Sequence, residues 1–387
     1  MKKRLLALVL ICTMAFSLSA CGKKEDKAET KTEKTEKASD AAPIEYDVDE
    51  YVTLGDYKGL EISLENTYEY SDEGFEEYLN TKIADAGVYV EDSDKKEVEE
   101  DSIVNVDYVG SQDGVAFDGG SAEDQMIDVA NNCSTSGSGY IDGFTSGLAG
   151  HSVGEEVAYE VTFPEQYGNA DLAGKTVTFT FQINYVAKAI ATKADLTDKI
   201  VSDNFSYDSV DKYVSAMKDD YESSLKSDLA NDTQTAVLNA LINNSTVSGV
   251  PEELLQARVD MYLKVYDKQY EAYGTTAKEY FESMGQDYDQ YVESLKTSVE
   301  ESTKTELILE AVARAEGIAI DEDGYKEFIS SVMGSTGSQE DDTAFYDIYS
   351  VDGYTGERYF RQAYLTQKAL DFCKDNANVT LGVKSAD

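Results

Sequence analysis

The chain has 387 residues, with 33 Lys or Arg against 76 Asp or Glu and a formal net charge of −43 at pH 7. A surface this acidic excludes a nucleic-acid backbone or an anionic lipid surface as a partner over most of the protein. The single histidine leaves little room for hydrolase chemistry or for a histidine metal site, and the length predicts two or three domains.

The N-terminus has the pattern of a bacterial export signal. Lys2, Lys3 and Arg4 are followed by an apolar run, residues 5–18, that is too short to span a bilayer comfortably. Leu18-Ser19-Ala20-Cys21 then resembles a lipobox. We expect a signal peptide over residues 1–20 and acylation of Cys21, which would hold the protein on the outer face of the cytoplasmic membrane by lipid alone. A plain secretory signal with an incidental cysteine is the alternative.

Residues 21–44 are expected to form a charged, disordered tether. Residues 23–40 carry six Lys and six Asp or Glu with almost no apolar side chains, so they cannot bury enough surface to fold. Beyond the signal, no apolar run is long enough to predict a transmembrane helix.

A strand and a helix are predicted over residues 45–100. Residues 51–62 alternate as a strand does, and Ser71-Asp72-Glu73 supplies an N-cap and an acidic first turn for a helix that reaches about Ala86. This segment is interpreted as a linker into the next domain.

Residues 101–190 predict a compact β-rich domain. A strand over residues 102–110 runs into Asp113-Gly114, a strong hairpin signal, and returns through residues 115–120. Residues 139–148 predict a short, glycine-punctuated turn of helix. Strands over residues 157–163 and 177–186 complete the domain.

Five segments of this domain carry a family resemblance. They are Val-Asp-Tyr-Val-Gly, Ala-Phe-Asp-Gly-Gly, Ile-Asp-Gly-Phe, Gly-Leu-Ala-Gly-His-Ser-Val-Gly-Glu-Glu and Thr-Phe-Pro-Glu-Gln-Tyr. In this order and spacing they resemble an FKBP-type peptidyl-prolyl isomerase domain in the variant found in trigger factor. The resemblance implies an antiparallel sheet wrapped on a short helix and cis–trans isomerase (rotamase) activity without a cofactor or a metal.

The resemblance also implies the lining of a proline-binding pocket. Phe144 would be its floor, Phe117 and Phe179 its walls, and the Ile141 N–H would hold a substrate carbonyl near Tyr167. The full set of implied catalytic residues is Tyr108, Phe117, Asp118, Tyr140, Ile141, Phe144, Tyr167 and Phe179. The alternative is that all eight belong to the core of a small barrel that catalyses nothing.

Some positions depart from the family pattern or carry no site. Gln125 stands where an aromatic residue or Leu is usual on the pocket wall, and the loop Asn131 to Ser138 is longer than usual. Cys133 and Cys373 are expected to be free thiols. His151 is expected in a surface turn, and residues 321–324 predict a helix start and not a calcium loop.

Residues 191–387 change to helical spacing. A helix is predicted to open at Asn204-Phe205 and to continue to Ile242, and Val250-Pro251-Glu252 predicts a second start. Further helices are predicted over residues 280–284, 288–295, 307–315, 325–332 and 359–372. Residues 205–379 resemble the C-terminal helical domain of trigger factor, related to SurA-type chaperones, whereas the family's ribosome-docking domain is not expected upstream. We therefore expect an α+β multidomain protein with an all-α chaperone domain bearing helical arms.

These sequence features support three hypotheses for function. The first is a membrane-anchored, extracytoplasmic foldase whose partners are unfolded or newly exported polypeptides with X-Pro bonds, and not the ribosome. The second is a chaperone or surface scaffold with a vestigial isomerase pocket. The third, an adhesin or solute-binding lipoprotein, shares only the lipobox. The long apolar stripes over residues 255–273 and 359–372 are the predicted surfaces for holding unfolded chains.

Overall fold

The chain folds into two compact units. The computed structural model describes residues 42–271, 273–338 and 340–382. One unit, here called the sheet unit, is Glu69–Lys226; the other, the helical unit, combines the residues up to Tyr68 with those from Ser227 onward. The signal, the tether and Cys21 lie outside the described residues.

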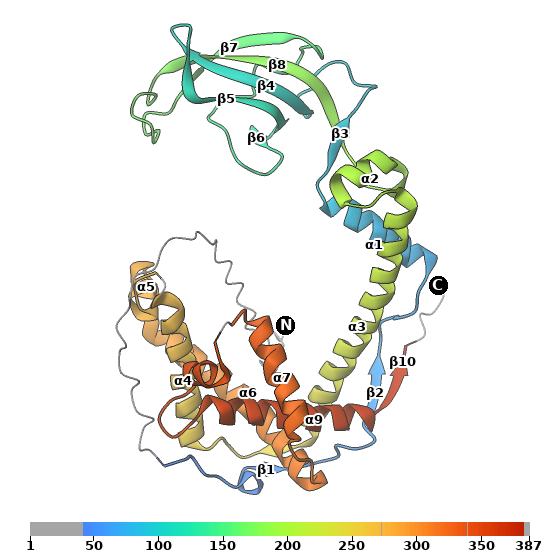
Figure 1. The fold of residues 1–387 in the computed structure, drawn as a ribbon, viewed down its shortest axis with the longest axis vertical. Helices are drawn as coiled ribbons and strands as arrows, with labels where there is room; N and C mark the ends of the chain where they lie inside the picture. Colours follow the sequence, from blue (N-terminus) through green and yellow to red (C-terminus); the bar gives the residue numbers. More distant parts are fainter. Residues whose placement is uncertain (1–41, 272, 339, 383–387) are drawn as a thin grey trace. The chain divides into compact units, whose positions relative to one another are not determined.

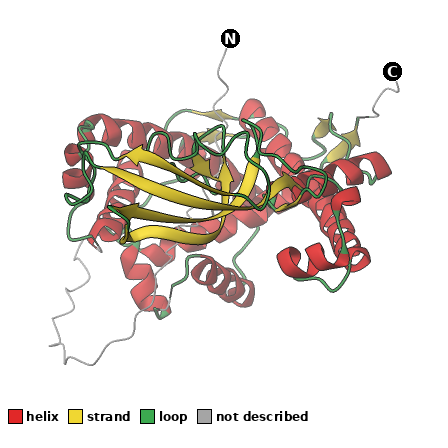
Figure 2. Ribbon diagram, turned by 90° about the horizontal axis from the view of Figure 1, so that it is seen from above, coloured by secondary structure: helices red, strands yellow, loops and turns green. Residues whose placement is uncertain are grey.

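The sheet unit contains an antiparallel sheet in the order β3-β8-β4-β5-β6, with β7 paired to β8 (Figures 1 and 2). The strands are β3 (Tyr89–Glu91), β4 (Ile103–Gln112), β5 (Val115–Asp128), β6 (Cys133–Ser134), β7 (Glu156–Thr162) and β8 (Thr176–Ala189). Asp113 and Gly114 join β4 to β5 with φ values of 54° and 82°. Two positive φ angles in a two-residue hairpin match the twist of the strands, so the predicted turn is confirmed.

Alternation along the long strands places one face of the sheet in the core. Val177, Phe179, Phe181 and Ile183 are buried at every second position of β8, while the residues between them are partly exposed. Val104 and Val106 of β4 lie in the same core. Because side chains alternate across a strand, this spacing brings both phenylalanines of β8 to the same face.

Residues 139–148 form turns and not a regular helix. Phe144 N–H donates to the Ile141 carbonyl, and Leu148 N–H donates to the Thr145 carbonyl. These bonds span three residues and are tighter than those of an α-helix. Gly143, at φ 83°, takes up a backbone conformation that a regular right-handed helix does not contain.

Three α-helices and the short 3₁₀ helix η2 (Lys193–Asp195) complete the sheet unit. The α-helices are α1 (Asp72–Asp85), α2 (Asp198–Phe205) and the first part of α3 (Val210–Asn244). The Ser71 hydroxyl accepts from Gly74 N–H, which confirms the predicted cap. The prediction that Asn204-Phe205 opens a helix is wrong, because these residues end α2. Ser206 is left-handed there, at φ 62°, and α3 begins only where the Asp198 carboxylate accepts from Val210 N–H.

The helical unit is built mainly from helices, shown in Figure 1. They are the second part of α3, α4 (Glu252–Glu271), α5 (Ala277–Ser283), α6 (Tyr288–Glu316), α7 (Glu322–Ser335), α8 (Asp342–Ile348) and α9 (Gly356–Asp375). The predicted start after Pro251 and the cap of α7 at Asp321 are confirmed. The two helices predicted over residues 288–295 and 307–315 form one continuous helix. Among the described helices, none has the length and apolar character needed to cross a bilayer.

The segment before Tyr68 is integral to the helical unit. β1 (Val52–Thr53) pairs antiparallel with β9 (Thr246–Val247), and β2 (Glu61–Leu64) pairs parallel with β10 (Asn378–Leu381). The predicted single strand over residues 51–62 is thus two strands with different partners. Upstream, Val48 of the short helix η1 (Val48–Glu50) is buried against α6, and Ile44 is buried against α4.

Candidate functional site

A cluster of aromatic rings covers the inner face of the sheet. Ring centroids of neighbouring members are 4.4 to 6.5 Å apart. We call this set the aromatic cluster: Tyr108 from β4, Phe117 from β5, Tyr159 from β7, Phe179 and Phe181 from β8, and Tyr140, Phe144, Phe163 and Tyr167 from loops. The structure therefore brings together all the aromatic residues that sequence reasoning assigned to the pocket.

Phe144 lies at the centre of the aromatic cluster. Its ring stacks on Tyr140 at 4.4 Å and meets Phe179 edge-on at 4.9 Å. Tyr108 and Phe181 each approach it to 5.1 Å. Only 3% of Phe144 is exposed, so the residue expected as a pocket floor is covered by its neighbours in this conformation.

Phe117 lies against two glycine backbones. A Cβ atom built on Gly110 would come within 2.5 Å of the Phe117 ring, and one built on Gly120 within 2.3 Å. Real Cβ atoms essentially never come this close to another atom, so a side chain at either position would displace the Phe117 ring. The ring then meets Phe179 edge-on at 6.0 Å.

The polar candidates lie at the margin of the aromatic cluster. Ile141 packs against it, and within the described residues its N–H donates no hydrogen bond. Tyr167 is 39% exposed, and its ring lies 4.6 Å from Phe163. Asp118 is exposed beside Phe117 and is not packed into the cluster.

Sequence reasoning missed three members of the aromatic cluster. Phe181 is fully buried and contacts Phe144, and the alternation of β8 would have revealed it beside Phe179. Phe163 follows β7 directly and joins Tyr167 to Phe117. The Tyr159 hydroxyl donates to the Phe144 carbonyl, a contact that no local pattern indicates.

The electrostatics of the cluster favour apolar binding. Burial raises the pKa of Tyr108, and burial together with Tyr108 and Cys133 raises that of Tyr140, so both phenols stay neutral at physiological pH.

His151 pairs with Glu155 at 2.9 Å and is not a cluster member. The Gln125 amide turns to its own strand and donates to the Glu123 carbonyl at 2.9 Å. An arrangement of this kind suits a reaction that transfers no proton.

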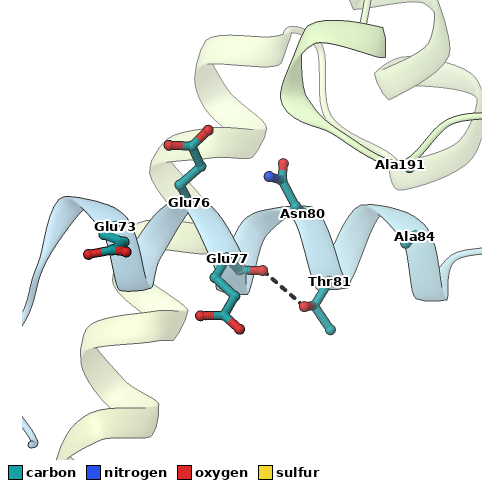
Figure 3. Close-up of a pocket in the computed structure, with 7 residues that line it drawn as sticks. All are labelled: Glu73, Glu76, Glu77, Asn80, Thr81, Ala84 and Ala191. Atoms are coloured by element: carbon teal, nitrogen blue, oxygen red, sulfur yellow. Dashed lines mark hydrogen bonds between the residues drawn. The ribbon is translucent and has the colours of Figure 1, made fainter.

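A shallow depression on α1 does not resemble a site. It is lined by Glu73, Glu76, Glu77, Asn80, Thr81, Ala84 and Ala191, drawn in Figure 3. The Thr81 hydroxyl donates to the Glu77 carbonyl of the same helix, and the three glutamates are exposed. This is the solvated face of an amphipathic helix.

In the helical unit, exposed large apolar side chains lie on α5 and in the segments directly before and after it. Tyr273 is 79% exposed, Met284 62% and Tyr280 42%, and the Tyr280 ring stacks on Tyr270 at 4.7 Å. We call these four residues the arm tip. Much of the remaining predicted stripe is core, since Leu255 and Val259 of α4 are buried. The same holds for Phe360 and Leu370 of α9.

Comparison with known proteins finds similarity to two family models and to whole relatives. The family described as "Bacterial trigger factor protein (TF) C-terminus" matches residues 209–375, and "FKBP-type peptidyl-prolyl cis-trans isomerase" matches residues 94–186. Trigger factor of Staphylococcus carnosus is 31% identical over 339 residues, covering 83% of this chain and 74% of that protein. Trigger factor of Clostridioides difficile is 29% identical over 327 residues, covering 84% and 72%. A solved structure described as "Promiscuous Substrate Recognition in Folding and Assembly Activities of the Trigger Factor Chaperone" aligns with a TM-score of 0.40 at 15% identity, covering 84% and 72%, a likeness too weak to inform the site.

Proposed function

Because the chain belongs to the trigger factor family and carries an FKBP-type domain, we propose that it is a foldase that isomerises X-Pro bonds in unfolded chains and holds those chains while it acts. The observation that carries this proposal is the aromatic cluster around Phe144, with the unused Ile141 N–H at its margin.

The chemistry needs little more than such a surface. Rotation about an X-Pro amide crosses a barrier of ~18–20 kcal/mol because the C–N bond has partial double-bond character. An apolar pocket that takes the amide out of water favours the twisted, less conjugated state. The Ile141 N–H would bind the substrate carbonyl, while Phe117 and Phe179 flank the proline ring.

Access to Phe144 requires Tyr140 to move. The two rings are stacked at 4.4 Å and Phe144 is 3% exposed, so a proline ring cannot reach it in the conformation seen. Tyr140 lies in a loop and is itself partly exposed, so its ring can rotate away without unfolding the strands. Substrate binding and this rotation are therefore coupled in the proposed mechanism.

The vestigial-pocket hypothesis is the second candidate, and the covered Phe144 and polar Gln125 favour it. A scaffold of this kind would grip prolyl peptides without accelerating their isomerisation. Exchange spectroscopy on a prolyl peptide separates the two, because binding broadens the peptide signals whereas catalysis transfers magnetisation between its cis and trans forms.

The arm tip provides a test of the holding function. Replacing Tyr273 and Met284 by Ser should weaken the suppression of aggregation of an unfolded protein several-fold, because two large exposed apolar contacts are removed. Turnover of a short prolyl peptide should be unchanged. Val115→Ser is the matched control, since Val115 is 70% exposed but lies in the hairpin of the sheet unit. Equal losses for both changes would contradict a specific role for the arm tip.

We further propose that the protein is lipid-anchored on the extracytoplasmic face and that its clients are newly exported chains. This rests on the cationic start, the apolar run and Cys21, all outside the described residues. Cys21→Ser should shift the protein from the membrane fraction to the soluble fraction, because acyl chains supply the attachment. Washed membranes that retain the variant as fully as the native protein would contradict the anchor.

A further inference from the structure

The Asn132 side chain contacts three residues of the loop that carries Tyr140, Ile141 and Phe144. The Asn132 amide donates to the carbonyls of Tyr140, at 3.2 Å, and Ile141, at 3.0 Å. Its oxygen accepts from Thr145 N–H at 3.1 Å, and the Thr145 hydroxyl also lies 3.1 Å away. Both donors and the acceptor of the amide are thus used on a single loop.

The backbone at Asn132 has a conformation that favours asparagine. Its φ is 50°, in the left-handed region that Asn and Gly adopt more readily than other residues. The Asn132 carbonyl accepts from Tyr140 N–H at 2.9 Å, so the main chain and the side chain of Asn132 both form hydrogen bonds with the same loop. Just after it, Cys133 and Ser134 pair with β5 and tie this segment to the sheet.

The bond to the Tyr140 carbonyl also fixes the direction of the Ile141 N–H. These two groups belong to one peptide plane, which is trans, and in a trans peptide the C=O and N–H point in opposite directions. With the carbonyl held by the Asn132 amide, the N–H points away from Asn132. Within the described residues it donates no hydrogen bond, so it is available to a ligand.

We propose that Asn132 is a positioning residue for the isomerase site, orienting the Ile141 N–H that receives the substrate carbonyl. The proposal rests on the isomerase function proposed above. Asn132 acts through the loop and does not touch the substrate. Donation to the Tyr140 carbonyl also polarises that peptide and strengthens its N–H as a donor.

Two changes at Asn132 separate positioning from folding. Asn132→Gly suits the positive φ and removes the amide, and Asn132→Asp keeps the size but places a carboxylate against two carbonyls. Asn131→Ala is the matched control, because the Asn131 side chain bonds to Asp128 and not to the loop.

The experiment combines steady-state kinetics on a prolyl peptide with amide NMR of the full chain. Both Asn132 variants should raise KM about tenfold with little change in kcat. The reason is that the Ile141 N–H binds the substrate carbonyl equally in the ground state and in the twisted state, so its misplacement weakens both to the same extent. The Ile141 and Thr145 amide signals should shift in both variants and stay in place in Asn131→Ala.

Unchanged KM in Asn132→Gly, or an Ile141 signal identical to that of the native protein, would overturn the proposal. So would a fall in kcat alone. If the native protein shows no turnover, the proposed function fails, yet the Ile141 signal still reports whether Asn132 orients that N–H.

Discussion

Phe144→Ala should lower kcat/KM for a prolyl peptide by about 10- to 100-fold and destabilise the sheet unit by about 3–5 kcal/mol. The activity loss follows from removing the apolar surface on which the proline ring would rest. The stability loss follows because Phe144 is 3% exposed and packs against Tyr140, Phe179 and Phe181, so truncation leaves a cavity. Peptide exchange kinetics and urea unfolding measure the two effects.

Phe345→Ala is the matched control for this change. Phe345 is 1% exposed in the helical unit and packs against Phe360 at 5.2 Å, so its truncation should be similarly destabilising. It lies outside the aromatic cluster, and kcat/KM should stay within twofold of the native value. A Phe144→Ala protein that turns over peptide at the native rate would place the catalytic surface elsewhere.

Arg258→Met should destabilise the helical unit by about 3–5 kcal/mol, because it leaves the Glu306 carboxylate buried without its partner. The two side chains are 3% and 13% exposed and form an ion pair, and the Arg258 guanidinium lies 5.9 Å from the Tyr354 ring and 5.7 Å from that of Tyr359. Burial works to lower the pKa of Arg258, but Glu306, Tyr354 and Tyr359 together raise it, and the pKa lies well above its ordinary value.

The double change to Met at Arg258 and Glu306 should recover most of that loss, since an apolar pair of similar size carries no desolvation cost. Arg314→Met is the control: Arg314 pairs with Asp47 but is 52% exposed, so its loss should stay below about 1 kcal/mol. Hydrogen exchange of the α6 amides reports the stability of the helical unit alone, whereas an unfolding curve of the whole chain combines the two units. Additive losses in the double variant would show that the buried charges are not coupled.

Local patterns predicted the elements whose signals lie within a few residues. The Asp113-Gly114 turn, the Ser71 cap and the start after Pro251 each depend on one local preference, and each is found. Long-range pairing could not be predicted in this way. β2 pairs with β10, so Glu61 meets Asn378 across most of the chain, and no local pattern encodes that partner.

The candidate site likewise contains residues that local motifs predicted and contacts that they could not predict. Family motifs named most of the aromatic cluster, because those residues sit inside recognisable segments. The packing of Phe117 depends on Gly110 and Gly120, which lie on two different strands of a hairpin. The hydrogen bonds of Asn132 depend on a loop that departs from the family pattern. Both are products of tertiary contact, which one sequence does not display.

The most direct test of the proposed function is the cis–trans exchange rate of a short X-Pro peptide in the presence of the intact protein. Uncatalysed exchange takes roughly tens of seconds at 25 °C. The aromatic cluster predicts exchange that accelerates in proportion to protein concentration and falls back in Phe144→Ala. Exchange at the uncatalysed rate, with the peptide nonetheless bound, would contradict isomerisation and leave a chaperone that only grips its clients.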